Sequence, residues 1–530
     1  MSRLARLAYP VLFAISLVLA IALKGAGQYS ASDLALVTVA TVVVTVLAIA
    51  TVALLVRALD RSERAAPLTA TLAMLVVAWF FFYVPAQRAA QAITWRGSRD
   101  ELLIPIGIVA TVLIAIWLVR QSAERLDAIN GFMLRFGVLL LVVVGGRLAV
   151  SQGYTPPAAK RSALVRQLAE PVRIASASAA ERNQPKRDIY PIVLDGHSNM
   201  RVAREVAQFE DSSFVDSLRT LGFVIPQDMH SNYVQTILSM PSLLNGSHLT
   251  QLTNDAGIDN PSFALPGYLV ENNRTARFLR TQGYKYVLFP SMWWTQSQHS
   301  PLADVVYDSR PERTLANEAR RTELRQAVFN STLLRYKSLS VLDTLHEKRT
   351  MEGLKRLAAD PAPTFAFAHV LLPHMPYYLD ASCHVLQRPI IPEVEDSSAA
   401  QRAARMEQRK CVDSMVLDVV TTVLHESKTP PVIMVVGDHG SRFNAPRFVD
   451  HADSLPPAFM RERFGAMGAF YMPAGGDTLF TGHVSLVNVV GKVLRYYFGA
   501  DLPTNPDDMY VSGTRPFHFY PVDSTGYLTR

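Results

Sequence analysis

The chain has 530 residues, of which 49% are hydrophobic and 18% are charged, and its formal net charge is +7 at pH 7. This length exceeds that of one compact domain, and a mean hydropathy of +0.14 is high for a soluble protein. Residues 1–150 carry a net charge of +6 and the remainder only +1. The composition therefore gives no indication of a basic nucleic-acid-binding domain.

The first 150 residues contain five apolar segments. Each is close to the ~20 residues that a helix needs to cross a bilayer, and a cleaved signal peptide would account only for the first. We therefore predict a transmembrane domain of five helices over residues 1–150. The segments are 8–23, 34–56, 67–84, 102–119 and 132–150.

Arginines flank alternate ends of these segments, and the positive-inside rule places such ends in the cytoplasm. The opposite 86–101 loop also holds three arginines, which weakens the contrast. Five spans would put everything after residue 150 outside the cytoplasm. The arginines at the alternate ends are Arg3, Arg6, Arg57, Arg61, Arg64, Arg120 and Arg125.

Residues 151–187 are small, polar and proline-containing, which predicts a juxtamembrane linker with one or two helical turns at 161–169. From residue 188 to 530, short apolar runs alternate with amphipathic stretches, as in an α/β domain with a mostly parallel sheet. The predicted strands are 190–194, 286–289, 364–370, 432–436 and 469–471.

Two of these strands end at an acid close to a glycine. The first runs into Asp195-Gly196, and the second into Gly437-Asp438-His439-Gly440. Functional groups gather beyond the carboxyl ends of parallel strands, so Asp195, Asp438 and His439 are candidate metal ligands. The alternative is that each Asp-Gly pair only makes a tight turn.

The two cysteines, Cys383 and Cys411, both belong to the external domain. Disulfides are favoured outside the cytoplasm, so we predict that the two are joined. Two free buried thiols are the alternative.

Two carboxylates with one imidazole suit Zn²⁺ or Mn²⁺, with Mg²⁺ or Ca²⁺ as alternatives. The stretch at 230–249 predicts an amphipathic helix with Thr236 at its N-terminus, where a hydroxyl beside a cation could become a nucleophile. Thr236 could instead be only a helix cap. Ser231 and Ser239 lie nearby, one in a loop and one inside the helix.

Six stretches in order carry a family resemblance: "IYPIVLDGHSN", "GFVIPQDMHSNYVQTILSMPSLLN", "FLRTQGYKYVLFPS", "SPLADVVY", "FAFAHVLLPHMPY" and "VVGDHGSRF". The chain resembles the membrane-anchored sulfatase-like proteins of the alkaline phosphatase superfamily, and it is similar to lipoteichoic acid synthases and lipid A phosphoethanolamine transferases. The resemblance implies an alkaline phosphatase/sulfatase-like fold, with a mostly parallel central sheet sandwiched by helices.

The resemblance also implies roles for individual residues. Asp195, Asp438 and His439 match metal ligands, and Thr236 matches a nucleophile that also binds the metal. His374 matches a histidine that touches the substrate or protonates the leaving group. His369 differs from it by an odd number of positions and would point away along an extended segment, which favours a supporting role. His299 and His483 match no motif firmly. We expect one metal ion.

A formylglycine sulfatase needs Cys or Ser in a Cys/Ser-x-Pro-x-Arg motif, which the chain lacks. We therefore predict a metal-dependent phosphotransferase or hydrolase acting through Thr236 on a phosphodiester such as a lipid head group. The acceptor would be a membrane lipid, an envelope glycan or water. Alternatives are a phosphodiesterase or sulfatase-like hydrolase that releases its product to water, and a catalytically silent membrane scaffold. The sequence does not predict the oligomeric state.

Overall fold

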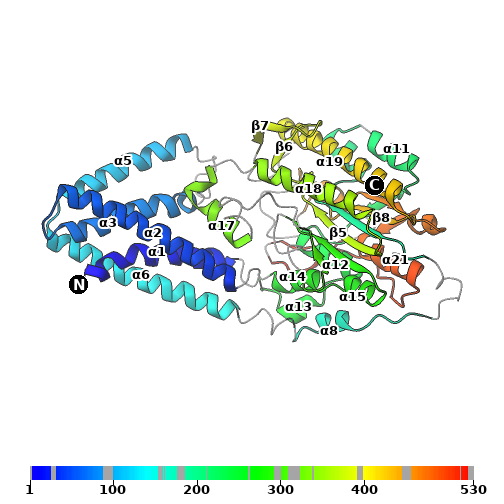
Figure 1. Cartoon of the computed structure of the whole chain (residues 1–530), viewed down its shortest axis with the longest axis horizontal. Coiled ribbons are helices and arrows are strands. Elements are labelled where there is room, and N and C mark those ends of the chain that lie inside the picture. The colour runs from blue at the N-terminus through cyan, green and yellow to red at the C-terminus, as the bar shows by residue number, and fades with distance from the viewer. Residues whose placement is uncertain are drawn as a thin grey trace. The chain divides into compact units, whose positions relative to one another are not determined.

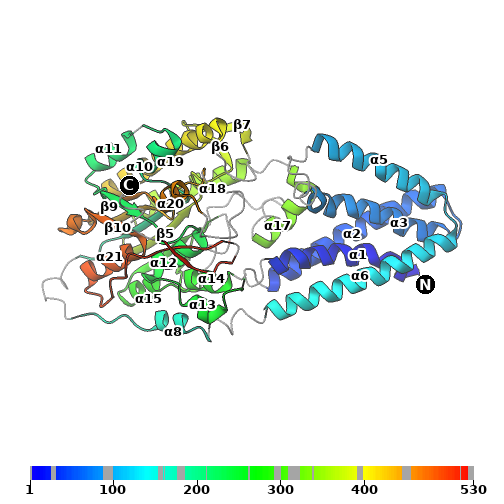
Figure 2. The same ribbon diagram turned by 180° about the vertical axis from the view of Figure 1, so that it is seen from behind.

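The structure is a computed structural model, and it divides into two compact units: Met1–Tyr154 with Glu312–Ser338, and Thr155–Pro311 with Leu339–Arg530 (Figures 1 and 2). The sequence did not separate 312–338 from the second unit. The described residues are 3–24, 31–87, 100–152, 159, 161–175, 185–210, 212–260, 263–291, 300–307, 323–336, 340–390, 398–443, 455–513 and 515–522.

The first unit is built from long apolar helices. Three stretches are long and apolar enough to cross a membrane, namely Ala31–Leu59, Ala65–Gln87 and Ala123–Val150, and the helical stretches Leu7–Leu23 and Ile104–Val119 are apolar but shorter. The structure thus supports three candidate spans among the described residues, not clearly the five predicted. Its helices are α1 (Arg3–Lys24), α2 (Ala31–Leu59), α3 (Ala65–Val77), η1 (Ala78–Phe82), α5 (Asp100–Val119), α6 (Ala123–Gln152), α17 (Glu323–Ser331) and η3 (Leu333–Tyr336).

The second unit is built on a six-stranded sheet with the order β4-β3-β5-β1-β8-β9. All neighbours are parallel except β8 and β9. The predicted mostly parallel sheet and all five predicted strands are confirmed; the two-residue strand β4 was missed. The strands are β1 (Ile189–Leu194), β3 (Lys285–Phe289), β4 (Val305–Val306), β5 (Thr364–Val370), β8 (Val432–Gly437) and β9 (Gly468–Tyr471).

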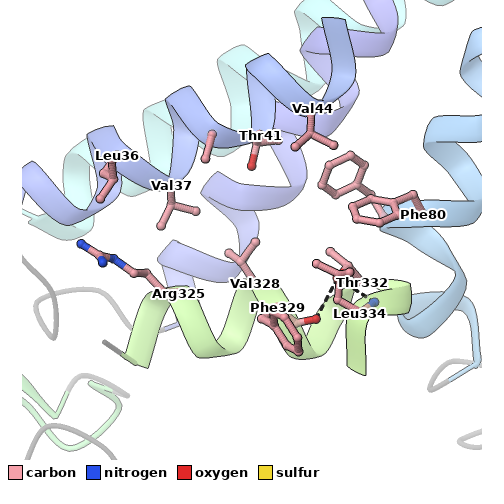
Figure 3. Close-up of a pocket in the computed structure, with 12 residues that line it drawn as sticks. Leu36, Val37, Thr41, Val44, Phe80, Arg325, Val328, Phe329, Thr332 and Leu334 are labelled. Atoms are coloured by element: carbon pink, nitrogen blue, oxygen red, sulfur yellow. Dashed lines mark hydrogen bonds between the residues drawn. The ribbon is translucent and has the colours of Figure 1, made fainter. Parts of the chain in front are cut away.

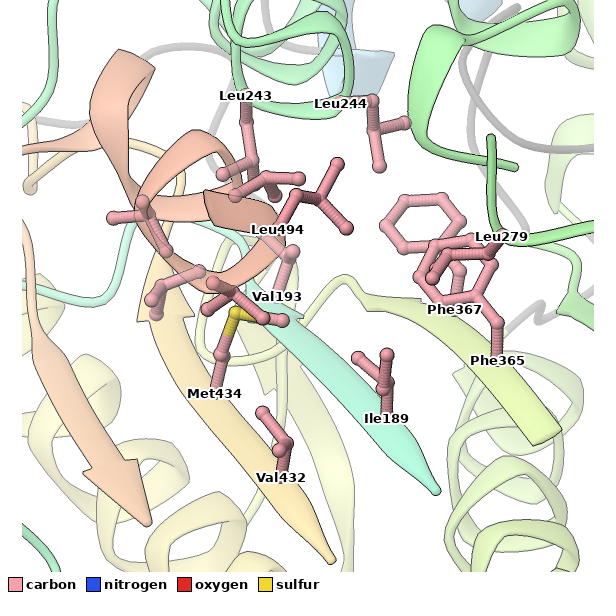
Figure 4. Packing of buried hydrophobic residues seen from close by; sticks show 14 of the residues in the cluster. Ile189, Val193, Leu243, Leu244, Leu279, Phe365, Phe367, Val432, Met434 and Leu494 are labelled. Carbon is pink, nitrogen blue, oxygen red and sulfur yellow. The ribbon is translucent and has the colours of Figure 1, made fainter. Parts of the chain in front are cut away.

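Both faces of this sheet are covered because alternate residues of each strand point to opposite sides. Ile189 and Val193 join Met434 in one core, which Figure 4 shows beneath Leu243 and Leu494. The intervening strand residues pack into a second core on the other face. The first core includes residues of α12 (Thr236–Asn245), α15 (Arg274–Thr281) and α21 (Val489–Phe498), and the second includes residues of α11 (Ser213–Thr220), α18 (Ser340–Leu357) and α19 (Ala399–Glu426).

Part of the predicted linker is structured. The helix α8 (Ala163–Ala169) begins at Ser162, whose side chain accepts a hydrogen bond from the backbone N–H of Val165. Leu164 and Leu168 form an apolar face of this helix within an otherwise polar segment. Both are buried in a cluster with other residues of the second unit.

Shorter elements complete the second unit. Its remaining helices are α10 (Met200–Ala207), α13 (Leu252–Ala256), α14 (Ala264–Glu271), α20 (Pro457–Phe464), η5 (Gly476–Phe480) and η6 (Leu486–Asn488). Its paired strands are β2 (Asp228–His230) with β10 (His483–Ser485), β6 (Tyr377–Leu379) with β7 (Val385–Ile390), and β11 (Met509–Val511) with β12 (Tyr520–Val522).

Candidate metal centre

The two acids that follow the apolar runs lie side by side. Strands β1 and β8 are parallel neighbours, and Leu194 is paired with Gly437, so Asp195 and Asp438 leave the sheet at the same edge. Their exposed fractions are only 2% and 0%. Two carboxylates buried this closely repel each other unless one is protonated or a cation lies between them.

The glycines beside the acids have separate structural reasons. Gly196 adopts φ +68°, a left-handed conformation that costs glycine little. At Gly437 a Cβ atom would collide with the backbone carbonyl oxygen of His197. The tight turn and the close approach of two backbones therefore both favour glycine at the end of the strands.

Backbone groups fix the Asp438 carboxylate. Its Oδ1 accepts hydrogen bonds from the N–H of Gly196 at 2.8 Å and from the N–H of His439 at 2.9 Å. Burial and the neighbouring Asp195 carboxylate raise the pKa of Asp438 to about 7, although the bond from Gly196 opposes this rise. A bound cation would offset the repulsion that raises this pKa.

His439 places its Nε2 atom beside both acids. Nε2 lies 3.2 Å from Asp438 Oδ2 and 3.9 Å from Asp195 Oδ1. The other ring nitrogen, Nδ1, lies 3.0 Å from the Gly440 carbonyl oxygen, so we assign the ring proton to Nδ1 and the lone pair to Nε2. Burial and the Arg463 guanidinium hold the pKa of His439 well below its usual range. One ligand atom from each of Asp195, Asp438 and His439 lies within 4.8 Å of the other two.

Thr236 faces this triad from the start of a helix. It is the first residue of α12, directly after the cap residue Gln235, and its Oγ1 lies 3.0 Å from His439 Nε2. The hydroxyls of Ser231 and Ser239 both donate to the Tyr233 carbonyl oxygen, at 2.9 and 3.0 Å. The predicted helix is confirmed, and Thr236 is the one of these three hydroxyls that is in contact with the triad.

These residues fit a divalent cation. Asp438 Oδ2 and both ring nitrogens of His369 are buried without a hydrogen-bond partner in the part of the chain that the structure describes. Such groups are costly unless an ion or water satisfies them. Carboxylates, imidazole and a hydroxyl form a donor set that suits Zn²⁺ or Mn²⁺.

His369 lies closer to the site than its sequence position suggested. Its Nε2 is 3.7 Å from Asp195 Oδ2, and burial together with His374 lowers its pKa to about 3. The prediction that His369 and His374 point in opposite directions assumed that the segment between them is extended. That assumption was wrong, because β5 ends at Val370 and residues 371–376 turn.

A buried glutamine anchors the turn that carries His374. Gln408 of α19 accepts hydrogen bonds from the N–H of Tyr378 and Leu379, and it donates to the carbonyl oxygen of His374 at 2.9 Å. The ring Nδ1 of His374 donates to the Met375 carbonyl oxygen at 2.6 Å. Gln408 therefore ties three backbone groups of the 374–379 segment to α19.

The cysteines tie the same region to α19. Cys383 and Cys411 form a disulfide with a Cα–Cα distance of 5.0 Å. Cys411 is fully buried within the helix. The bridge therefore joins the turn between β6 and β7 to the longest helix of the second unit.

Sequence reasoning missed two arginines of the site. Arg463 of α20 donates to His439 Nε2 at 2.9 Å and to the carbonyl oxygens of Gly440 and Val234. Arg405 of α19 donates to the Gly196 carbonyl oxygen at 2.5 Å. Neither belongs to a local motif that could have revealed it. Their charges favour an anionic group at this site.

Two weaker candidates lie elsewhere. His483 is half-exposed on β10 and faces Asp228 at 3.9 Å, not the triad. His299 lies outside the described residues.

Comparison with known proteins supports a family assignment. No curated protein matches the chain. Among solved structures, the C-terminal periplasmic domain of EptC from Escherichia coli is 12% identical, with a TM-score of 0.41 over 68% of this chain and 98% of that domain. A structure of the same domain in complex with Zn has a TM-score of 0.43, at 12% identity over 67% of this chain and 96% of that one.

Two further structures are similar at the same low level. The periplasmic domain of the phosphoethanolamine transferase EptC from Campylobacter jejuni is 11% identical, with a TM-score of 0.37 over 61% of this chain and 97% of that domain. The 2-O GAG sulfatase BT1596 is 16% identical, with a TM-score of 0.38 over 61% of this chain and 72% of its own. The sulfatase family model matches residues 204–469, about half of the chain. The chain therefore belongs to the sulfatase family.

Proposed function

We propose that the protein is a membrane-bound, metal-dependent phosphotransferase or hydrolase in which Thr236 attacks a phosphodiester such as a lipid head group. The observation that carries this proposal is the position of Thr236 Oγ1, 3.0 Å from His439 Nε2 at the N-terminus of α12. The first-turn N–H groups and the helix dipole favour an anion there.

The reaction would proceed in two displacement steps. In the first, a bond forms between Thr236 Oγ and phosphorus, the bond from phosphorus to the leaving oxygen breaks, and the hydroxyl proton of Thr236 passes to water. His374 is the candidate donor of a proton to the leaving oxygen. In the second step the oxygen of an acceptor hydroxyl or water bonds to phosphorus, the bond from phosphorus to Thr236 Oγ breaks, and Thr236 takes up the proton that the acceptor loses. A bound cation would lower the proton affinity of the threonine hydroxyl and stabilise the charge on the phosphoryl oxygens.

Sulfate-ester cleavage through formylglycine is disfavoured by the same helix. Residues 239–243 read Ser-Met-Pro-Ser-Leu, so Leu243 stands where that motif needs arginine. Leu243 is 1% exposed and packs in the first core, with Val193 and Met434. Membership of the sulfatase family therefore does not lead us to propose sulfatase chemistry of that type.

The membrane location that we propose is multi-pass. Five helices would cross the cytoplasmic membrane of a bacterium, and the catalytic domain over 188–530 would face the periplasm or the exterior. The apolar helices of residues 1–150 and the arginines at alternate ends support this arrangement. A site held at the membrane has a raised effective concentration of lipid substrates.

Intact-protein mass spectrometry on quenched enzyme tests the nucleophile. Full-length protein in vesicles of phosphatidylethanolamine and phosphatidylglycerol should acquire a head-group adduct that maps to Thr236. Thr236→Ala should lose the adduct and turnover while keeping its thermal stability, and Thr236→Ser should retain measurable activity. Ser231→Ala is the matched control and should keep the adduct. An adduct on Ser231 or Ser239, or full activity in Thr236→Ala, would contradict the proposal.

The product separates transfer from hydrolysis. Lipid and glycan mass spectrometry of cells with and without the gene should reveal a modified lipid or glycan if the enzyme transfers the head group. Release of the free head group alone would indicate the hydrolase alternative. Absence of turnover in every preparation that holds metal would favour the silent scaffold.

A further inference from the structure

An apolar pocket of about 400 Å³ lies within the first unit, between α2, η1 and the α17–η3 segment. Figure 3 shows Leu36 and Val44 of α2 on one side, Phe80 of η1 at one end and Phe329 of α17 on the opposite side. A volume of this size is typical of ligand-binding cavities.

The polar groups of the pocket are largely satisfied by the protein itself. The Thr332 hydroxyl donates to the Phe329 carbonyl oxygen at 2.8 Å and accepts the N–H of Leu334 at 3.2 Å. Arg325 Nε donates to Asp33 Oδ1 at 2.7 Å. The other lining residues, apart from Thr41, are apolar. A ligand that needs several hydrogen bonds would lose its hydration here without replacement, so the chemistry favours a hydrocarbon.

The depth of the pocket along α2 also favours a hydrocarbon. The helix has 29 residues and is therefore about 43 Å long, which exceeds the ~30 Å hydrocarbon core of a bilayer. Its first turn, which holds Asp33, would lie near the head groups. The lining residues between Leu36 and Val44 then extend over about 12 Å, most of one leaflet of acyl chains.

The rim of the pocket is open and apolar. Leu36 is 50% exposed, Val44 44% and Leu334 38%. Leu36 and Val44 belong to a candidate membrane span, so acyl chains of the surrounding lipid would be the medium in contact with this opening. The Arg325 guanidinium lies at the end nearest the start of α2 (Figure 3), where a lipid phosphate would be.

We propose that this pocket binds one acyl chain of a membrane glycerophospholipid, with the phosphate at the level of Arg325. The α17–η3 segment, which forms one wall, follows β4 and precedes α18 in the chain. An acyl chain would thus contact a segment that is covalently continuous with the catalytic unit. The proposal requires α2 to be in the membrane, but it is independent of any chemistry at Thr236.

Photolabelling tests the site directly. Full-length protein is reconstituted in phosphatidylglycerol vesicles that contain a phospholipid with a diazirine in the middle of one acyl chain. After irradiation and digestion, adducts should concentrate on the lining residues of α2, η1 and 323–336. Ala40→Phe should fill the pocket and reduce these adducts about tenfold, because excluding a few methylenes changes affinity by that much. Ala50→Phe, another exposed alanine of α2 that does not line the pocket, is the matched control and should leave labelling unchanged.

Four results would overturn the proposal. Even labelling along the exposed face of α2 would mean ordinary contact with bulk lipid, as would labelling that Ala40→Phe does not reduce. A dimer in native mass spectrometry that Ala40→Phe dissociates would assign the pocket to a second copy of the chain. Equal labelling by a diazirine diacylglycerol, which is neutral and has no phosphate, would contradict the placement of the phosphate at Arg325. Because labelling needs no turnover, Thr236→Ala should label like wild type, which separates this test from that of the proposed function.

Discussion

Breaking the Cys383–Cys411 disulfide should lower the free energy of unfolding of the second unit by about 3–4 kcal/mol. The two cysteines are separated by 28 positions. For a loop of that length, the loss of chain entropy in the unfolded state corresponds to about 3.6 kcal/mol at 25 °C. The bridge also connects a surface turn to the buried face of α19, so its loss should loosen the turn locally.

The assay is urea unfolding of the full-length protein in detergent, followed by the fluorescence of tryptophan and tyrosine. Oxidised wild type is compared with reduced wild type and with Cys383→Ala/Cys411→Ala. Because Cys411 is fully buried, replacing it by alanine also leaves a small void. The single variant Cys411→Ala under reducing conditions measures the loss of stability from this void, which is then subtracted from that of the double variant. Equal urea midpoints for the oxidised and reduced wild type would refute the reasoning, as would alkylation of both thiols in the native protein.

A glutamine variant separates stability from positioning. Gln408→Leu would leave the N–H groups of Tyr378 and Leu379 buried without their acceptor, at a cost of roughly 1–3 kcal/mol for each group. It would also release the carbonyl oxygen of His374. Gln408→Leu should therefore reduce both stability and turnover. Reduction of the disulfide, by contrast, should lower stability with little change in turnover. Unchanged turnover in Gln408→Leu would mean that His374 is not positioned by this anchor.

Three further outcomes are expected. Burial raises the pKa of Glu271 to about 7 from 4.5, so folding favours its neutral form. The free energy of unfolding of wild type should therefore fall by up to about 3 kcal/mol as pH rises from about 4.5 through 7. Thermal unfolding of Glu271→Gln between pH 5 and 8 should not show this loss of stability, and a pH profile identical to that of wild type would contradict the assignment. A chelator should lower the melting temperature of wild type but not of Asp438→Asn, because only a protein that binds the cation is stabilised by it; equal shifts would argue against the site. A periplasm-dependent reporter fused after Gln152 should be active and one fused at Arg61 inactive, and the reverse pattern would overturn the proposed topology.

The sheet could be predicted from sequence because its central strands are fully buried. Strand β5 was predicted at its observed bounds, and the others to within one residue, since runs of β-branched and aromatic residues end at clear turn residues. Strand β4 has only the two residues Val305 and Val306, both exposed, so no burial pattern marks it. Tertiary pairing with β3 alone defines it.

The candidate site was partly predictable for the same reason. Asp195, Asp438 and His439 directly follow two fully buried strands that are parallel neighbours, so their proximity follows from topology. Arg405 and Arg463 come from helices whose sequences carry no such mark, and only the folded chain brings them together. The direction of His369 relative to His374 could not be predicted by alternation, because that rule holds within a strand and β5 gives way to a turn after Val370.

The pairing of β1 with β8 has a consequence for biogenesis. Asp195 and Asp438 are 243 positions apart in the chain, yet they follow strands that are immediate neighbours. During synthesis β1 emerges long before its partner, and contacts across such a distance form late and slowly. The triad cannot assemble until β8 has been synthesised. Metal loading would then be among the last steps of maturation, and a truncated chain that ends before β8 would remain without a site.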